Sequence, residues 1–244
     1  MFDNRRDVYT ISRLLEKPRT HMNIELKKAS LLFAALVLFV SSSFADVVYR
    51  NTTGDLLTTL NSGTREVGDE IILGGTSRSL TNFTLQYSAT ANTVGLARLR
   101  FYENNGAPSN GYTNTPGSVF FDSGTFSLDP APTGSTLIFD LETNPEFALF
   151  TLPDHFTWTM QFTFATGSGG VDLFNPVTVG SSYADFWEND GTGWALRVMT
   201  NGTPVNFAAQ IEAVPEPSTF ALGALGFAVF VGVFARRQIR GNRV

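Results

Sequence analysis

Residues 156–164 read Phe-Thr-Trp-Thr-Met-Gln-Phe-Thr-Phe, so large apolar side chains alternate with polar ones over nine positions. Because successive side chains of a β-strand point to opposite faces, this period of two puts five large groups on one face of a sheet. Three threonines and a glutamine fall on the other face. The segment predicts a strand with one buried and one exposed face.

Further short strands are expected along the chain, with turn clusters rich in Gly, Asn and Pro between them. In residues 94–102, the side chains of Arg98 and Arg100 share one face and those of Leu99 and Phe101 share the other. The other expected strands cover residues 71–73, 83–87, 119–121, 137–141, 177–179, 195–199 and 207–211. No amphipathic helix interrupts them. The fold class is therefore all-β, and we expect an antiparallel β-sandwich of jelly-roll type.

An export signal precedes this predicted domain. The basic pair at 27–28 is followed by an apolar stretch over 29–40 and by small residues ending at Ala45. This order is typical of a secretory signal peptide and predicts cleavage between Ala45 and Asp46. Residues 1–45 are therefore set apart from the exported domain as the signal region.

The first residues of the chain allow two interpretations. Residues 1–21 are charged and rich in arginine, which is unusual ahead of a signal peptide, whereas Met22 would begin a signal of ordinary length. We expect residues 1–21 to be a start-site extension. The alternative is a genuine cytoplasmic extension followed by a signal anchor over residues 29–45. Both interpretations place the exported domain at residues 46–213.

Residues 214–244 contain three elements in a fixed order. The motif Pro215-Glu216-Pro217 comes first, and an uncharged apolar run of 16 residues, 220–235, follows it. A helix of that length spans about 24 Å, against a hydrocarbon thickness of about 30 Å, so the run predicts a short transmembrane helix. A basic stop-transfer cluster comes last and comprises Arg236, Arg237 and Arg240. By the positive-inside rule these arginines stay cytoplasmic and the domain lies outside; an ordinary tail anchor is the alternative.

This tripartite tail resembles the PEP-CTERM sorting signal in Pro215, Glu216 and Pro217, in the apolar run and in the arginine cluster. The resemblance implies a Gram-negative-type bacterium that exports extracellular polysaccharide. It also implies a partner, the integral-membrane cysteine transpeptidase exosortase, which recognises the motif and removes the tail. The resemblance covers about the last thirty residues. It implies sorting and carries no information on what the sorted domain does.

A second resemblance lies inside the domain. Residues 100–106, Arg-Phe-Tyr-Glu-Asn-Asn-Gly, and residues 116–122, Pro-Gly-Ser-Val-Phe-Phe-Asp, look like the choice-of-anchor sandwich domains of exported bacterial proteins. Those domains occur with various C-terminal anchoring signals. The alternative is a strand, an Asn-Gly turn and a second strand, which any sandwich could contain. No site residue follows from this resemblance.

Charge and cysteine content exclude several classes of function. Residues 46–213 carry 17 acidic residues, six arginines and no lysine, a net charge of about −11. Such a domain repels phosphate backbones, so nucleic acid is not an expected partner. The acidity could attract divalent cations, although solubility is the favoured explanation. The chain has no cysteine, which excludes disulfides, thiolate catalysis and Cys-ligated metals.

No catalytic constellation is evident in residues 46–213. His155 is the domain's one histidine, and no Gly-x-Ser-x-Gly motif accompanies it, so neither a Ser-His-Asp triad nor a zinc site is expected. Asp185, Glu188 and Asp190 are the densest group of carboxylates, but their spacing in sequence cannot place two of them across a sugar. We expect no enzymatic activity, no cofactor and no metal.

Residues 183–194, Tyr-Ala-Asp-Phe-Trp-Glu-Asn-Asp-Gly-Thr-Gly-Trp, form the most unusual stretch of the domain. Aromatic faces beside acids and amides suit sugar rings, which makes Trp187, Trp194, Asp185 and Asp190 the candidate sugar contacts. Oxygen ligation of calcium is another possibility, although the stretch does not match the EF-hand pattern. The favoured alternative is a β-hairpin that turns at Asn189-Asp190-Gly191 and packs its aromatic residues into the core.

Together these features predict an exported protein of the cell surface or extracellular matrix, sorted through its tail and without catalytic activity. The alternative is a carbohydrate-binding module that retains the protein in exopolysaccharide. A third hypothesis, a hydrolase of matrix polymers, requires a cleft with two carboxylates. The expected partners are an exosortase-type membrane protease, the membrane through the C-terminal helix, and extracellular polysaccharide.

Overall fold

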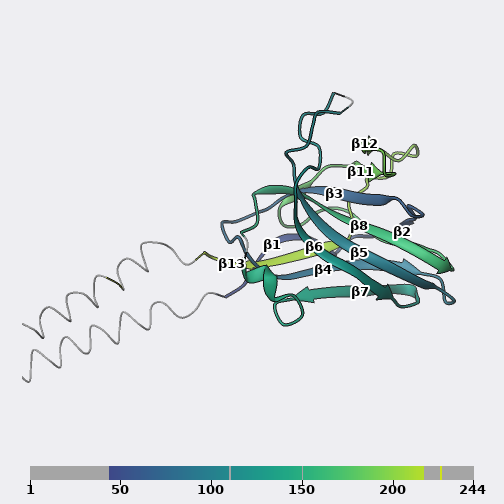
Figure 1. Ribbon diagram of the computed structural model, residues 1–244, viewed down its shortest axis with the longest axis horizontal. Helices are drawn as coiled ribbons and strands as arrows, with labels where there is room; N and C mark the ends of the chain where they lie inside the picture. The colour runs from purple at the N-terminus through teal and green to yellow at the C-terminus, as the bar shows by residue number, and fades with distance from the viewer. Residues whose placement is uncertain (1–43, 110, 150, 217–225, 227–244) are drawn as a thin grey trace, which may run out of the picture. The chain divides into compact units, whose positions relative to one another are not determined.

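Two antiparallel β-sheets face each other across an aromatic core (Figure 1). The computed structural model describes residues 44–109, 111–149, 151–216 and 226. The predicted signal peptide up to residue 43 therefore lies outside the described residues, as does the apolar run apart from Gly226. Among the described residues 44–216, helical structure is limited to one short 3-10 turn, Pro145–Leu149.

The first sheet is centred on β4, Ser79–Ala89. One edge of β4 pairs with β7, Ala131–Asp140. Along the other edge, β13 pairs with the first half of β4 and β9 with its end. β1 completes the sheet beside β13, and β2 does so beside β9. These four strands are β13, Ala209–Val214, β9, Gly169–Phe174, β1, Asp46–Asn51, and β2, Asp55–Leu60.

The second sheet has the order β12-β11-β3-β8-β5-β6, and the short β10 also pairs with β3. Its central strands are β3, Glu66–Ile72, β8, His155–Thr166, and β5, Val94–Glu103. The remaining strands are β6, Val119–Leu128, β10, Ser181–Ser182, β11, Phe186–Asn189, and β12, Trp194–Arg197. The loop 104–118 leaves the end of β5 and stands beside the β11–β12 hairpin (Figure 1).

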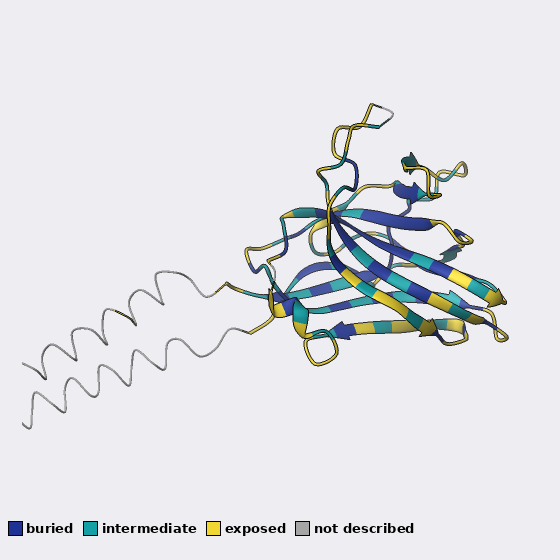
Figure 2. Cartoon of the chain, viewed as in Figure 1, coloured by how far each residue is buried: buried dark blue, intermediate teal, exposed yellow. Residues whose placement is uncertain are grey.

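Four of the five large side chains predicted to face the core from residues 156–164 are fully buried, and the fifth, Phe164, is partly buried. Phe156, Trp158, Met160 and Phe162 of β8 are fully buried. The Phe83 ring, from the opposite sheet, lies 5.2 Å from that of Trp158 in an edge-on arrangement. Because the chain has no cysteine, this aromatic packing takes the stabilising role that disulfides have in many exported domains. Figure 2 shows buried and partly buried positions alternating along the middle of β5.

The opposite face of β8 differs from the prediction. Thr157 and Thr159 were expected to be exposed, yet both are fully buried. Their hydroxyls donate hydrogen bonds to Asn104 at 2.8 Å and to Glu66 at 2.5 Å. The neighbouring position is Gly68, where a Cβ atom would lie 2.7 Å from Thr159 Cγ2. Loop 104–118 and the β11–β12 hairpin cover this outer face of the second sheet, which is therefore partly buried.

Several strand predictions also need correction. Residues 177–179 form no strand; Val179 makes a single bridge to Arg50. The strand expected from Phe207 begins at Ala209; Phe207 itself makes only an isolated bridge to Leu173, and its amide donates 2.9 Å to the carboxylate of Asp69. The strands β1, β2, β9 and β10 were not predicted. The other expected strands are present, most of them longer than predicted.

Candidate functional site

The strand β13 ends directly at the motif that resembles a sorting signal. Its last residue is Val214, and Pro215 and Glu216 follow as exposed residues. Proline cannot donate to a β-ladder, which explains why the strand stops there. The residue before Val214, Ala213, is fully buried. The change from a paired strand to an exposed junction therefore occurs within two residues.

The predicted signal-cleavage site lies beside this junction. Asp46 is the first residue of β1, and its Cα partner on β13 is Ala213. The side chain of Asp46 accepts a 2.6 Å hydrogen bond from the buried hydroxyl of Ser77. Ala45 precedes the strand and is exposed. The residues where both predicted processing events take place therefore meet at one end of the first sheet.

The remaining tail residues with predicted roles lie outside the described residues. They are Pro217, the apolar run 220–235 apart from Gly226, and the basic cluster Arg236, Arg237 and Arg240. Over the part of the chain that the structure describes, no helix has both the length and the apolar character needed to cross a bilayer.

The four candidate sugar contacts do not form one site. Trp187 lies on β11 and is only 2% exposed. Its indole N–H donates 3.1 Å to Glu70, and its ring packs edge-on against Tyr112 at 5.9 Å. Asp185 lies before β11, and burial together with the charge of Glu70 raises its pKa. Trp187 and Asp185 are thus part of the cover over the sheet, and Trp187 offers no free face to a ligand.

Trp194 and Asp190 instead line an open hollow between loop 104–118 and the β11–β12 hairpin. This hairpin hollow has a volume of about 530 Å³, and its walls include Pro108, Pro116 and Arg197. The Trp194 ring is partly exposed and packs edge-on against Tyr102 at 5.3 Å. Hydrogen bonds from Thr192 lower the pKa of Asp190, so this carboxylate is ionised at neutral pH.

The hairpin matches the favoured interpretation of residues 183–194 only in part: the turn is present and Phe186 and Trp187 are buried, whereas Trp194 is partly exposed and does not pack into the core. β11 and β12 pair antiparallel, and the chain turns between them at Asn189-Asp190-Gly191. Gly191 has φ +98°, which favours glycine. Glu188 lies on β11 close to the turn, and its carboxylate contacts Arg65 at 3.0 Å and Arg197 at 3.2 Å. Both oxygens of Glu188 are therefore paired with arginine.

A polar cluster that was not predicted from the sequence lies beneath the hollow. Glu66 on β3 is its centre, with a side chain only 6% exposed. Its carboxylate accepts hydrogen bonds from Tyr102 at 3.0 Å and from Thr159, and it pairs with Arg100 at 3.1 Å. Burial and the charge of Glu66 raise the pKa of Tyr102. The cluster fixes the ring of Tyr102, on which Trp194 rests.

Glu70 joins three further segments on the same face of the sheet. It accepts hydrogen bonds from Asn104 at 3.2 Å and from Trp187, and its Oε1 lies 2.5 Å from Nε2 of His155. Among the described residues, no serine or threonine hydroxyl bonds to His155. Within the same part of the chain, no three His, Asp or Glu side chains gather as a metal site would require.

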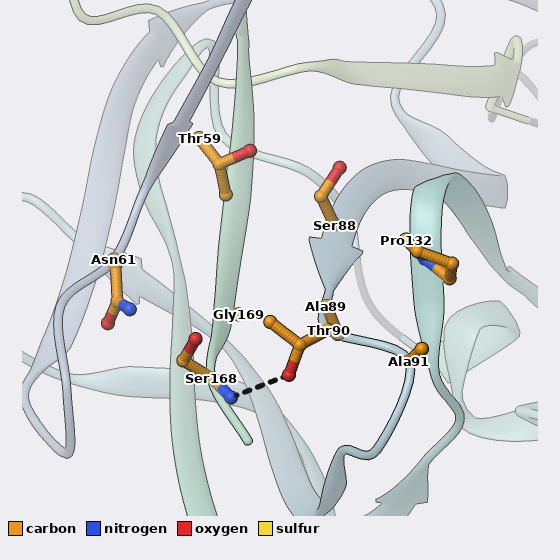
Figure 3. A pocket seen from close by; sticks show the side chains of 9 residues that line it. All are labelled: Thr59, Asn61, Ser88, Ala89, Thr90, Ala91, Pro132, Ser168 and Gly169. Carbon is orange, nitrogen blue, oxygen red and sulfur yellow. Dashed lines mark hydrogen bonds between the residues drawn. The ribbon is translucent and has the colours of Figure 1, made fainter.

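A second hollow, of about 400 Å³, opens at the end of the first sheet (Figure 3). Hydroxyl residues line it, and the Ser168 amide donates 3.1 Å to Thr90. Behind it, Asp172 accepts hydrogen bonds from Thr59 at 2.7 Å and Ser88 at 3.0 Å, and burial raises its pKa. None of the nine residues drawn in Figure 3 is charged or aromatic. This hollow is therefore a weaker candidate for ligand binding than the hairpin hollow.

Comparison with known protein families matches residues 213–238 to the PEP-CTERM protein-sorting motif. The chain carries a PEP-CTERM motif. The match begins at Ala213, inside β13, and extends through the junction described above. It supports a secreted protein that is sorted at the membrane through its C-terminal tail, consistent with an exosortase substrate. No curated protein and no solved structure matches the chain.

Proposed function

We propose that this protein is an exosortase substrate that ends at the cell surface or in the extracellular matrix, where its sandwich domain has no catalytic role. The observation that carries the proposal is the PEP-CTERM motif beginning in the last strand of a folded domain. The motif gives the domain a route to the outside. The strand gives the sorted product a defined C-terminal boundary.

We infer that the sandwich is a jelly roll. In the first sheet β4 lies between β7 on one side and β13 and β9 on the other, with β1 and β2 outermost; the principal strands of the second sheet are β3, β8, β5 and β6. The chain crosses between the sheets from β2 to β3, β3 to β4, β4 to β5, β6 to β7, β7 to β8, β8 to β9, β9 to β10 and β12 to β13. Repeated crossing of this kind, with eight principal strand positions in two sheets, is the arrangement that the jelly roll uses.

The geometry of the acidic residues favours a non-catalytic domain. Glu66 and Glu70 are four residues apart on one strand, a separation of about 13 Å along it. Glycosidases place their two carboxyl groups about 5–9.5 Å apart. Both oxygens of Glu188 are paired with arginines, and the charge of Glu70 contributes to the raised pKa of Asp185. This arrangement supports binding or structural roles over hydrolysis.

The test of sorting is the intact mass of the protein from its native host. We expect a species that begins at Asp46 and lacks the arginine cluster. Replacing Pro215, Glu216 and Pro217 with alanine should leave export intact and retain the tail. Normal tail removal in that triple-alanine variant would refute sorting through the motif.

A second candidate function is glycan binding in the hairpin hollow. The observation that favours it is the partly exposed Trp194 ring beside the ionised Asp190 and the guanidinium of Arg197. An aromatic face can stack on the C–H face of a sugar while the polar groups bond its hydroxyls. Because the domain carries a net charge of about −11, a neutral polysaccharide fits it better than an anionic one.

Affinity electrophoresis in gels containing a neutral hexose polymer tests this candidate. Trp194→Ala should raise the Kd obtained from the retardation at least tenfold, which corresponds to about 1.4 kcal/mol of binding free energy. Tyr183→Ala is the matched control, because Tyr183 is an exposed aromatic residue outside the hollow. If the unaltered domain is not retarded by neutral polymers, or if both variants lose retardation equally, the hollow is not a glycan site.

A further inference from the structure

The last strand is paired on both sides up to Ala213, and on the β4 side up to Val214. Ala213 pairs with Asp46 of β1 on one side and with Leu80 of β4 on the other. Val214, the final residue of β13, pairs with Ser79. A strand end usually frays, but this one lies between two neighbours.

Side chains pin the end of β13 further. The Thr81 hydroxyl donates 3.0 Å to the carbonyl of Glu212, and the buried Ser77 hydroxyl holds Asp46 in place beside Ala213. Ala213 is fully buried, so releasing it would expose apolar surface as well as break backbone hydrogen bonds. Detaching the last residues of β13 is therefore unfavourable.

A processing enzyme needs free backbone on its substrate. Peptides held in extended form are recognised through their own N–H and C=O groups, as in the addition of a strand to a sheet edge. Ala213 is paired in the sheet with both β1 and β4, and Val214 with β4. Pro215 and Glu216 are the first exposed residues after the strand.

We propose that the sorting enzyme acts on the folded domain and that β1 and β4 set the upstream limit of the peptide it grips, at Pro215. This inference rests on the proposed sorting function. The enzyme reads Pro215 and the residues that follow, while β13 stays in the sheet throughout. The processed protein therefore keeps its complete first sheet.

A disulfide that locks β13 tests the proposal, because the chain has no cysteine of its own. Asn82 on β4 and Glu212 on β13 are direct Cα partners. Antiparallel partners have Cα atoms about 4.5–5.5 Å apart, within the range a disulfide spans. The full-length variant N82C/E212C is purified in detergent, oxidised, and incubated with membranes of the native host. Mass spectrometry measures tail removal, and only the cross-linked species is counted.

We expect oxidised and reduced N82C/E212C to lose the tail at rates within twofold of each other and of the unaltered protein. A tenfold or greater slowing of the oxidised form, restored by reductant, would show that β13 must leave the sheet and would overturn the proposal. The single variants N82C and E212C control for the substitutions. The pair V47C/E212C repeats the test by locking β13 to β1, because Val47 is the β1 partner of Glu212.

The same assay separates this inference from the sorting function. If the membranes leave the unaltered tail intact, or remove the tail of the triple-alanine variant equally well, the sorting function fails. If they discriminate between these two proteins and only the oxidised cross-linked form stalls, sorting stands and the folded-substrate proposal fails. Inserting Gly-Ser-Gly-Ser between Val214 and Pro215 is a second check, because an enzyme that grips from Pro215 onward should process it within twofold of the unaltered protein.

Discussion

At the scale of single residues, Asp69 is where burial and charge conflict most directly. It is fully buried opposite Trp158 of β8. Its carboxylate accepts hydrogen bonds from Ser182 at 2.5 Å and from the Phe207 amide. Burial raises the pKa of Asp69 well above its usual range, and the two hydrogen bonds offset this only in part. The neighbouring Tyr49, also buried, has a raised pKa for the same main reason.

The raised pKa makes stability depend on pH in a defined direction. The folded state holds the Asp69 proton more tightly than the unfolded chain, whose pKa is about 3.9. The contribution to stability is therefore complete below about pH 4 and is lost as pH rises through the raised folded-state pKa. Asp69→Asn removes this titration, and its amide can donate to Ser182 while its carbonyl accepts from Phe207.

We expect Asp69→Asn to be more stable than the unaltered protein at pH 7, by about 0.5–3 kcal/mol. The advantage should shrink as the pH is lowered toward 4. Urea unfolding of both proteins across this range measures it. Asp122→Asn is the control, and its expected change in stability has the opposite sign, because the ion pair with Arg98 lowers the pKa of Asp122 in the unaltered protein. An advantage of Asp69→Asn that does not change with pH would rule out titration of Asp69 as the cause.

At the scale of elements, β2 contains a β-bulge. Its register against β9 shifts between Asp55 and Thr58, and Leu57 within this bulge has φ +53°. The Leu57 amide donates 2.7 Å to Asp55, while its side chain is 90% exposed. A leucine in the left-handed region is strained by about 1–2 kcal/mol, and here its side chain gains almost no burial in return.

Leu57→Asn should therefore stabilise the domain by about 0.5–1 kcal/mol, because asparagine adopts the left-handed region more readily. Urea unfolding measures this: the midpoint should rise while the dependence of the unfolding free energy on urea concentration stays unchanged. Ile138→Asn is the matched control, since Ile138 is an exposed apolar residue of β7 with negative φ. If both substitutions shifted the midpoint equally, relief of backbone strain at residue 57 would be excluded as the cause.

The elements that could be predicted from sequence are those with a strong local pattern. β8 and β5 alternate clearly, and the turn of the β11–β12 hairpin is marked by Asn189-Asp190-Gly191. β9 was missed because it begins with Gly169 and Gly170, which resemble a turn, yet all six of its residues are buried. The burial of Thr157 could not be predicted either, because its cover comes from loop 104–118 and from β11.

Among the candidate sites, too, those with a contiguous motif could be predicted from the sequence and those built from distant segments could not. Pro215 and Glu216 were found from sequence because the motif is contiguous and needs no tertiary contact. The hairpin hollow combines loop 104–118 with residues 188–197, so only Trp194 and Asp190 could be named beforehand. Glu66 gave no signal at all, since its partners Arg100 and Thr159 lie on other strands.

At the scale of the whole molecule, residues 44–216 form a compact unit by themselves. A protein comprising residues 46–216 should therefore unfold in one cooperative transition, with the same midpoint in the presence or absence of reductant because the chain has no cysteine. Calorimetry and circular dichroism measure this.

Ending the protein at residue 208 instead should prevent stable folding. This truncation removes β13, which leaves β1 without its partner and uncovers the first half of one edge of β4. Comparable cooperative unfolding of residues 46–208 would show that the last strand is dispensable. A truncation after Val214 is the control and should behave like residues 46–216.

The position of β13 between β1 and β4 also has a mechanical consequence. A protein held by its C-terminus in a flowing or shrinking matrix experiences tension along the chain that leaves Val214. That tension runs along β13, so the ladders on its two sides are sheared and many hydrogen bonds must rupture together. An edge strand pulled sideways would give way one bond at a time. The sheet therefore suits a domain that must stay folded while its attachment point bears load.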